Sequence, residues 1–251
     1  MEKKYPVELR LSWTCPKGGG APLLTMPNIP KPLHGNGLHP RTIFGSSTWD
    51  KMRKRTYYLA GYKCEACGKD CSTPGSCHSH ELFNIDYLSG TSTFARCACL
   101  CKDCHVLFIH SGRAITLYKK GNPLYPSSAL LRGAENGFKT IYEWNKAHPD
   151  KPKLKAYAVF LKYLKHPELA DKMAELIDKY EIEFWEENKK KYAPWDTWRV
   201  IVGEREYKTP YKDYAAWEEA MAKQSKDDYI RQVETPFKGG AFDEINNILR
   251  S

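Results

Sequence analysis

The sequence predicts an α+β protein built from three parts, and three observations support this. Residues 1–47 contain seven prolines and two glycine clusters, which leave no room for a long helix. Residues 48–120 contain most of the cysteines, placed around two strand-like segments. Residues 121–251 show mainly helical periodicity. We therefore expect a Pro/Gly-rich N-terminal arm, a small β-containing core and a mainly helical C-terminal region.

The N-terminal arm can wrap around its own domain or a partner, or it can form an ordered coil, and we favour the coil. A helix is expected to begin at Ser47 or Thr48, because the Thr48 hydroxyl can cap its first turn. Gly61 is expected to end that helix.

The core is expected to contain a β-hairpin followed by a helix. Residues 81–87 and 93–100 are the predicted strands, and Ser89-Gly90 is the turn signal between them. The helix is expected to begin near Cys104 and to end at Ser111-Gly112, where glycine suits a C-terminal cap.

The C-terminal region is expected to contain helices around residues 138–145, over 154–165 and after Pro167. Apolar residues recur every three to four positions after Pro167, and we expect them to form a core rather than a binding groove. A small β-hairpin is predicted near residues 197–209, followed by a short helix over 211–223.

Charge and hydropathy restrict the class of protein. No apolar run approaches the roughly 20 residues of a membrane span, and no apolar stretch follows the charged residues at the start of the chain. We therefore expect neither a membrane protein nor a secreted one, and the expected location is cytoplasmic. The formal net charge of +9 favours a polyanionic partner, and DNA is the partner we expect.

Two Cys-x-x-Cys pairs predict a structural metal site. Each pair, Cys64/Cys67 and Cys101/Cys104, places two sulfur atoms on one tight turn, and two such turns supply the four-sulfur shell that zinc prefers. Their separation, with a hairpin between them, is typical of a treble-clef-like zinc domain. A second group of cysteines either binds a second metal or consists of small buried residues, and we favour burial; its members are Cys71, Cys77, Cys97 and Cys99.

Histidines between and after the two Cys-x-x-Cys pairs are the candidate catalytic residues. Strand alternation places His80 opposite Phe83 and Ile85, so we expect the two apolar residues to face the core and His80 to face solvent, where a neutral imidazole can take a proton from water. His105 is expected at the start of the following helix. His110 lies five residues later, about 500° around an α-helix, and so is not expected on quite the same face as His105; the alternative is a position near the end of that helix. The remaining histidines are expected to be non-functional; they are His34, His39, His148 and His166.

These motifs resemble the HNH endonuclease-like family, and more closely a group of phage- and prophage-borne HNH-like proteins. The resemblance implies a ββα-metal fold, a structural zinc and DNA cleavage dependent on Mg or Mn, in the cytoplasm of a bacterial host. It also implies His80 as general base and His105 as a ligand of the catalytic metal. The matching residues are Cys64-x-x-Cys67-Gly68, His80-Glu81-Leu82, Ile85-Asp86-Tyr87, Leu100-Cys101-x-x-Cys104-His105 and Ile109-His110-Ser111-Gly112-Arg113, with further pieces at 33–35, 39–45, 49–50 and 195–213.

Two departures from the family pattern leave two hypotheses open. Ser79 stands where the family usually has a metal-binding Asp or His, and Arg96 stands where it usually has an Asn that orients the base. The first hypothesis is an active endonuclease, in which the missing ligand comes from Glu81, Asp86 or His110. The second is a degenerate HNH-like zinc module that binds DNA or a host or phage protein.

Basic residues near these motifs are the expected contacts to nucleic acid under both hypotheses. They are Lys51, Arg53, Lys54, Arg55, Arg96 and Arg113. Zinc-dependent base deaminases are excluded, because their His-x-Glu and Pro-Cys-x-x-Cys pattern does not occur here.

Overall fold

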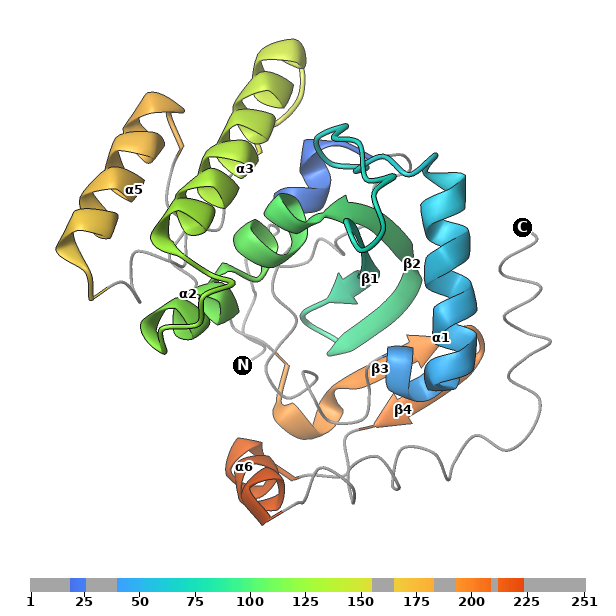
Figure 1. The fold of residues 1–251 in the computed structure, drawn as a ribbon. Coiled ribbons are helices and arrows are strands. Elements are labelled where there is room, and N and C mark those ends of the chain that lie inside the picture. Colours follow the sequence, from blue (N-terminus) through green and yellow to red (C-terminus); the bar gives the residue numbers. More distant parts are fainter. Residues whose placement is uncertain (1–18, 26–39, 155–164, 183–192, 209–211, 224–251) are drawn as a thin grey trace.

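The computed structural model describes residues 19–25, 40–154, 165–182, 193–208 and 212–223. These described residues form five α-helices and one four-stranded sheet, so the predicted α+β class is confirmed (Figure 1). Most of the predicted N-terminal arm and the helix predicted over 154–165 lie outside the described residues.

The elements follow one another in a simple order along the chain. They are the 3₁₀-helix η2 (Ala21–Thr25), α1 (Pro40–Leu59), β1 (Cys77–Asp86), β2 (Thr91–Cys101), the π-helix η4 (Asp103–Ile109), α2 (Ser111–Lys119), α3 (Ser127–Ala147), α5 (Pro167–Lys179), the 3₁₀-helix η6 (Trp195–Thr197), β3 (Arg199–Val202), β4 (Arg205–Lys208) and α6 (Tyr214–Lys223). No helix in the described part of the chain has the length and apolar content needed to cross a bilayer.

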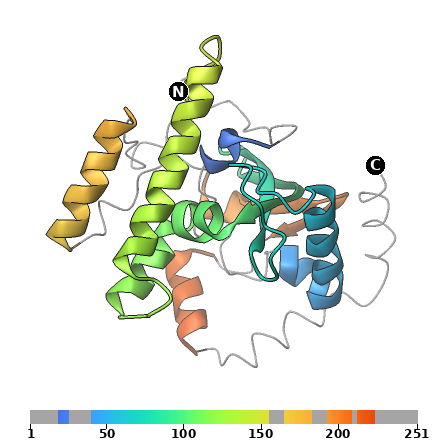
Figure 2. The same cartoon turned by 45° about the horizontal axis from the view of Figure 1, so that its top comes forward.

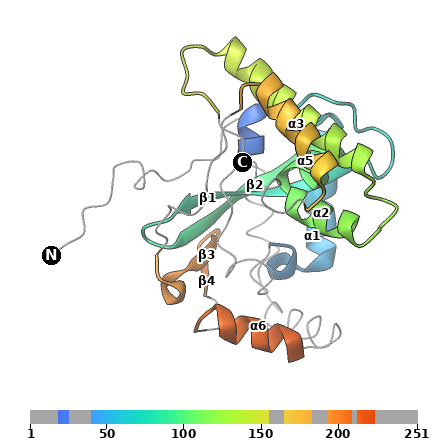
Figure 3. The same ribbon diagram turned by 90° about the vertical axis from the view of Figure 1, so that its left-hand side faces the viewer.

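The sheet joins the predicted core hairpin to the predicted C-terminal hairpin. β1 and β2 pair antiparallel, β3 runs parallel to the start of β2, and β4 pairs antiparallel with β3. The β3–β4 hairpin expected near 197–209 therefore belongs to the same sheet as the core, and α6 lies beyond it, away from α3 and α5 (Figure 3).

A β-bulge in the first hairpin changes which residues of β2 share a face. Leu82 pairs with Arg96 while Phe83 pairs with Phe94, which leaves Ala95 as the extra residue of β2. One extra residue in a strand shifts its alternation by one position. Phe94 and Cys97 therefore lie on the same face and join the same apolar cluster.

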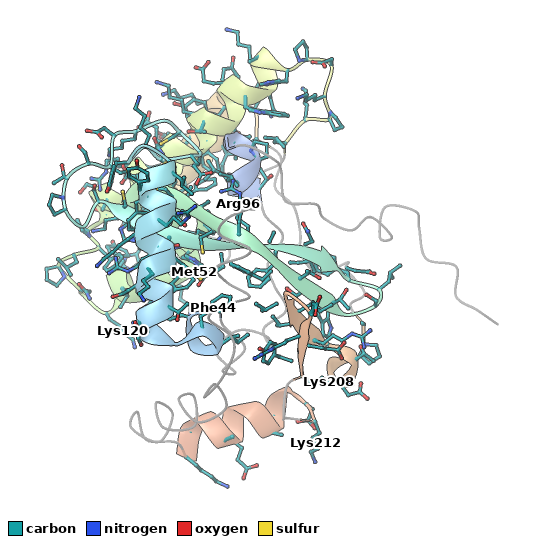
Figure 4. All side chains as sticks on the ribbon, turned by 90° about the vertical axis from the view of Figure 1, so that its right-hand side faces the viewer. Phe44, Met52, Arg96, Lys120, Lys208 and Lys212 are labelled. Atoms are coloured by element: carbon teal, nitrogen blue, oxygen red, sulfur yellow. The ribbon has the colours of Figure 1, made fainter. Side chains whose placement is uncertain are left out.

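Each face of the hairpin packs against a different set of helices. On one face, Phe83 and Ile85 pack with Trp49 and Met52 of α1, which crosses the sheet as Figure 4 shows. On the other face, Leu82 lies in a cluster with residues of η4, α3 and α5, and α3 and α5 lie side by side (Figure 2). Burial of apolar surface on both faces is the main stabilising contribution to the fold.

This two-sided packing corrects one expectation. Phe83 and Ile85 face a core as predicted, but His80 does not face solvent, because its side of β1 is covered by η4. The His80 residue is 8% exposed.

Two helix boundaries need comment. α1 spans Pro40–Leu59, but it consists of two helical pieces, because Gly45 between them has a non-helical φ of 74°. The second piece follows Gly45 directly, close to the start predicted at Ser47 or Thr48, and the piece from Pro40 was not predicted. The helix predicted to end at Ser111-Gly112 is two elements, since η4 ends at Ile109 and α2 then continues through Gly112.

Part of the predicted N-terminal arm belongs to the core. Leu23 and Leu24 of η2 are buried in the same cluster as α3 and η4. The amide of Gly20 donates a hydrogen bond to the carbonyl oxygen of Glu65, so this segment also contacts the first cysteine turn. A β-carbon at Gly19 would lie 2.3 Å from the same oxygen, which is why glycine is needed there.

Two glycines of α3 allow it to approach η4 closely. A β-carbon built at Gly133 would lie 2.3 Å from Cβ of Leu107, and one built at Gly137 would lie 2.2 Å from Cδ2 of Phe108. Gly133 and Gly137 are four positions apart, so they lie on one face of the helix. Their lack of side chains determines how near α3 packs to the segment that follows Cys101.

We expect Gly133→Ala to lower the free energy of unfolding by about 1–3 kcal/mol, because the added methyl group meets Cβ of Leu107, which cannot rotate away. Gly112→Ala in α2 is the matched control, since nothing lies within 4 Å of a β-carbon there and alanine favours helix. Urea denaturation followed by circular dichroism measures both variants. Equal stability of the two would contradict the close approach of α3 to η4.

Candidate metal centres

Four cysteines converge where the turn after α1, the β1–β2 hairpin and the π-helix η4 meet. We call the turn after α1, which contains Cys64 and Cys67, the first turn. Cys64 and Cys67 lie in the turn after α1, Cys101 ends β2, and Cys104 lies in η4. Their sulfur atoms all lie within 4.8 Å of one another, and the Sγ atoms of Cys67 and Cys101 are 3.8 Å apart. This cluster could hold a metal ion.

Local backbone geometry explains why both cysteine pairs can face one point. In the first turn, the amide of Gly68 donates to the carbonyl oxygen of Cys64 at 2.8 Å, and Gly68 has a φ of 75°, which suits glycine. In the second, the amide of Cys104 donates to Sγ of Cys101 at 3.4 Å. Both turns therefore fold their two sulfur atoms toward the same side.

The electrostatics of the cluster favour thiolates at two positions. Hydrogen bonds from Cys101 and Cys104 lower the pKa of Cys64 to about 6 and also lower the pKa of Cys67. The pKa of Cys104 is raised, because its thiol donates toward Cys101, Cys64 and Cys67. Thiolates are the form that binds metal, so the cluster is suited to exchange its protons for a cation.

Side chains from α3 and the first turn surround this cluster. Nδ2 of Asn136 donates to Sγ of Cys104 at 3.2 Å. Asp103 accepts hydrogen bonds from Lys69 at 2.9 Å and Arg132 at 3.1 Å. Burial opposes ionisation of Asp103, but these two cations outweigh it and lower its pKa. The outer contacts therefore fix η4 to both α3 and the first turn.

The remaining cysteines of the core differ from these four. Burial raises the pKa of Cys71 and of Cys97 to about 12, so both are thiols at neutral pH. In the described residues, no group of three or more ligating side chains includes Cys71, Cys77, Cys97 or Cys99. Cys71, Cys97 and Cys99 are buried, whereas Cys77 is half-buried.

Three histidines form a second cluster beside the cysteines. One ring nitrogen from each of His80, His105 and His110 lies within 4.8 Å of those of the other two. The ring centroids are 5.1 Å apart for His80 and His105, 5.5 Å for His80 and His110, and 4.8 Å for His105 and His110. His80 is buried, His105 is partly buried and His110 is exposed, so the cluster reaches solvent at His110.

The π-helix is the reason that His110 belongs to this cluster. An α-helix would turn His110 about 500° from His105, onto a different face. In η4 the amide of His110 donates to the carbonyl oxygen of His105 at 3.0 Å, which is the five-residue hydrogen bond of a π-helix. The expectation that the two histidines do not share a face was wrong, because the wider turn brings both side chains to the same side. The alternative position near the helix end agrees with the structure, since His110 directly follows the last residue of η4.

Burial keeps His105 neutral, which leaves its ring available as a ligand. Desolvation, followed by the influence of the His80 and His110 rings, lowers the pKa of His105 to about 2. Its Nδ1 is buried and has no hydrogen-bond partner among the described residues. A buried ring nitrogen without a partner is energetically unfavourable, and a bound cation would satisfy it.

His78 lies next to this cluster without being one of its three potential ligands. Its ring centroid lies 5.4 Å from that of His105. Burial, and then the charge of Lys102, lowers the pKa of His78. The two-residue spacing of His78 and His80 on one strand could have indicated that both side chains share a face.

The two carboxylates proposed as metal ligands lie elsewhere. Asp86 accepts hydrogen bonds from the amides of Leu88 and Ser89 and from the Ser89 hydroxyl, so it stabilises the turn between β1 and β2. Glu81 pairs across the hairpin with Cys97, on the face that packs against α1. Neither joins the histidine cluster, in which the third member is His110.

Arg96 is held away from the histidines. Its Nη1 lies 2.8 Å from Oε2 of Glu65 and donates to the carbonyl oxygen of Cys97 at 2.9 Å. Glu65 also accepts a hydrogen bond from the amide of Cys99 at 2.8 Å. Through Glu65, Arg96 therefore helps to hold the first cysteine turn against β2. Figure 4 shows its position on the hairpin.

The other predicted basic contacts lie on two helices. Lys51, Arg53, Lys54 and Arg55 belong to α1, where Arg53 pairs with Asp50 at 2.7 Å. Arg113 is exposed in the first turn of α2, and its amide donates to the carbonyl oxygen of His110 at 3.0 Å. Of these residues, only Arg113 is adjacent in the chain to the histidine cluster.

No protein-family model matches the chain, and neither a curated protein nor a solved structure matches it. Its function must therefore be inferred from the two clusters and their surroundings.

We expect Asn136→Ala to weaken metal binding at the four-cysteine cluster by about 10-fold, because the Cys104 sulfur loses the amide that hydrogen-bonds it. The rate of metal transfer to a chromogenic chelator measures this loss. Lys139→Ala, an exposed position one turn later on α3, is the control and should leave the rate unchanged. Identical transfer rates for Asn136→Ala and the unaltered chain would contradict this role of Asn136.

Proposed function

We propose that this chain is a metal-dependent DNA endonuclease of the HNH type, which hydrolyses phosphodiester bonds at the histidine cluster. The observation that carries this proposal is the convergence of His80, His105 and His110 beside the four-cysteine cluster. An alternative ligand set containing Asp86 or Glu81 has no geometric support, because both carboxylates lie away from the histidines.

We propose that the four-cysteine cluster holds a structural zinc ion in a treble-clef-like core. Four sulfur ligands suit zinc, and the burial of three of these cysteines suits a closed structural site. The order of turn, hairpin and helix around this cluster is the order that the HNH resemblance implies.

The histidine cluster suits a second cation of a particular kind. Neutral imidazoles favour late first-row transition metals, whereas Mg²⁺ favours oxygen ligands. Mn²⁺ shares this preference for oxygen. We therefore propose Zn²⁺ or Ni²⁺ there, in preference to the Mg²⁺ or Mn²⁺ that the HNH resemblance implies. When bound, such an ion supplies Lewis-acid stabilisation of negative charge on a phosphate oxygen.

Each side chain of the cluster has a proposed role. His105 and His110 hold the cation, and His80 takes the proton from the attacking water. Arg113, exposed three residues after His110, contacts a phosphate of the DNA. The net charge of +9 supplies the general attraction to the polyanion.

A degenerate HNH-like module that binds DNA, or a host or phage protein, is the second candidate function. Two observations favour it: the cluster contains no carboxylate, and His80 is buried. If all three histidines hold one cation, His80 is a metal ligand and the site lacks its expected general base. The chain would then bind its partner without cleaving DNA.

Plasmid nicking by the purified chain separates these candidates. We expect cutting with Zn²⁺ or Ni²⁺ but little with Mg²⁺, and we expect His110→Ala to reduce the rate at least 100-fold while the four-cysteine cluster keeps its metal. His110 is exposed, so its replacement should not disturb folding.

His166→Ala is the matched control, since His166 is a half-buried histidine at the N-cap of α5 and is not a member of the histidine cluster. Its nicking rate should equal that of the unaltered chain. Absence of cutting by a folded chain with every divalent metal would exclude the endonuclease and favour the binding module.

A further inference from the structure

The end of α1 and the turn after it form an exposed surface that the histidine cluster does not use. We call it the α1 surface. All its side chains are exposed, and it consists of Lys54, Arg55, Tyr58, Leu59, Tyr62 and Lys63. In Figure 4, α1 faces the viewer, and no other described element is drawn across its outer side.

Large apolar side chains are concentrated on the α1 surface to an unusual degree. Tyr58 is 71% exposed, Leu59 is 67% exposed and Tyr62 is 43% exposed. In the described part of the chain, Leu124 is the one other large hydrophobic residue with comparable exposure. Single exposed apolar residues are ordinary, but three within five positions indicate a surface that contacts another molecule.

The backbone at Tyr62 supports the same conclusion. Tyr62 has a φ of 53°, a left-handed conformation that non-glycine residues adopt at a cost. Hydrogen bonds fix this conformation, since its amide donates to Tyr57 and its carbonyl oxygen accepts from Cys71. Glycine would adopt this φ at a lower energetic cost than tyrosine. The Tyr62 ring is exposed, so packing within the described core does not require it. A contact of the exposed ring with another molecule would account for a tyrosine at this position.

The charge of this segment identifies the kind of partner. Residues 51–63 contain five lysines and arginines and no acidic residue. A polyanion complements that charge. Interleaved aromatic and basic side chains bind single-stranded nucleic acid, because bases stack on the rings while phosphates meet the cations. In a duplex the base faces are already stacked and are not available to a tyrosine ring.

We propose that the α1 surface binds single-stranded nucleic acid, with bases stacked on Tyr58 and Tyr62. Lysines and the arginine of the surface contact the phosphates. α1 packs on the hairpin face that carries Phe83, whereas His80 lies on the opposite face, so this contact is separate from the site of cutting. The inference shares with the proposed function only the premise that the ligand is a nucleic acid.

Fluorescence anisotropy with labelled oligothymidylate, and with a labelled duplex of equal length, tests this inference. The full-length, metal-loaded chain is used without chelator. We expect tighter binding of the single strand than of the duplex at equal salt. Tyr58→Leu should weaken single-strand binding roughly 5- to 20-fold, and Tyr58→Phe, which keeps the ring, should leave it unchanged.

Tyr62→Gly tests the contribution of the Tyr62 ring to binding without a loss of stability. Glycine suits the positive φ at this position, so we expect stability equal to or above that of the unaltered chain, with single-strand affinity reduced by a similar factor. Leu124→Ala is the control at the other exposed apolar position and should change nothing.

Equal affinity for duplex and single strand, or unchanged affinity in both Tyr58→Leu and Tyr62→Gly, would overturn the inference. A chain that nicks plasmid but shows either result retains the proposed function and lacks this surface role. Conversely, a chain that prefers single strands but does not nick supports the α1 surface and excludes the endonuclease.

Discussion

The convergence of the Cys64, Cys67, Cys101 and Cys104 sulfurs is the contact on which the rest of the described structure depends. It joins the turn after α1, the end of the hairpin and the first residues of η4. Glu65 in the first turn then binds both Gly20 and the amide of Cys99. A metal bound at this junction would stabilise the fold, because its binding free energy would add to the free energy of folding.

The position of the histidine cluster follows from that junction. Cys104 fixes the start of η4, and the helix must then run close to α3, which Gly133 and Gly137 permit. The π-helical turn is what aligns His105 with His110, and π-helical segments often occur at functional sites. Structure around the cysteines and chemistry at the histidines are thus connected through one seven-residue element.

The sequence alone predicted the local features well and the long-range ones poorly. The Cys-x-x-Cys spacing and the hairpin turn are signals within a few residues, and both correspond to what the described residues form. The burial of His80 could not be predicted, because strand alternation does not say which faces are covered. The π-helix also has no short-range signature, since the choice between i→i+4 and i→i+5 hydrogen bonds depends on packing against α3. The pairing of β3 with β2 joins residues about a hundred positions apart, which no periodicity reveals.

That last pairing has a consequence for the order in which the chain is made. Thr91–Thr93 of β2 can meet Arg199–Ile201 of β3 only after the chain has been synthesised through residue 201. Until then the edge of β2, and apolar residues such as Ile85 that Trp198 later helps to cover, are left without their final neighbours. Contacts between distant residues form slowly, and unpaired strand edges promote association between chains. During translation the nascent chain is therefore most vulnerable to aggregation in the interval between the emergence of β2 and that of β3.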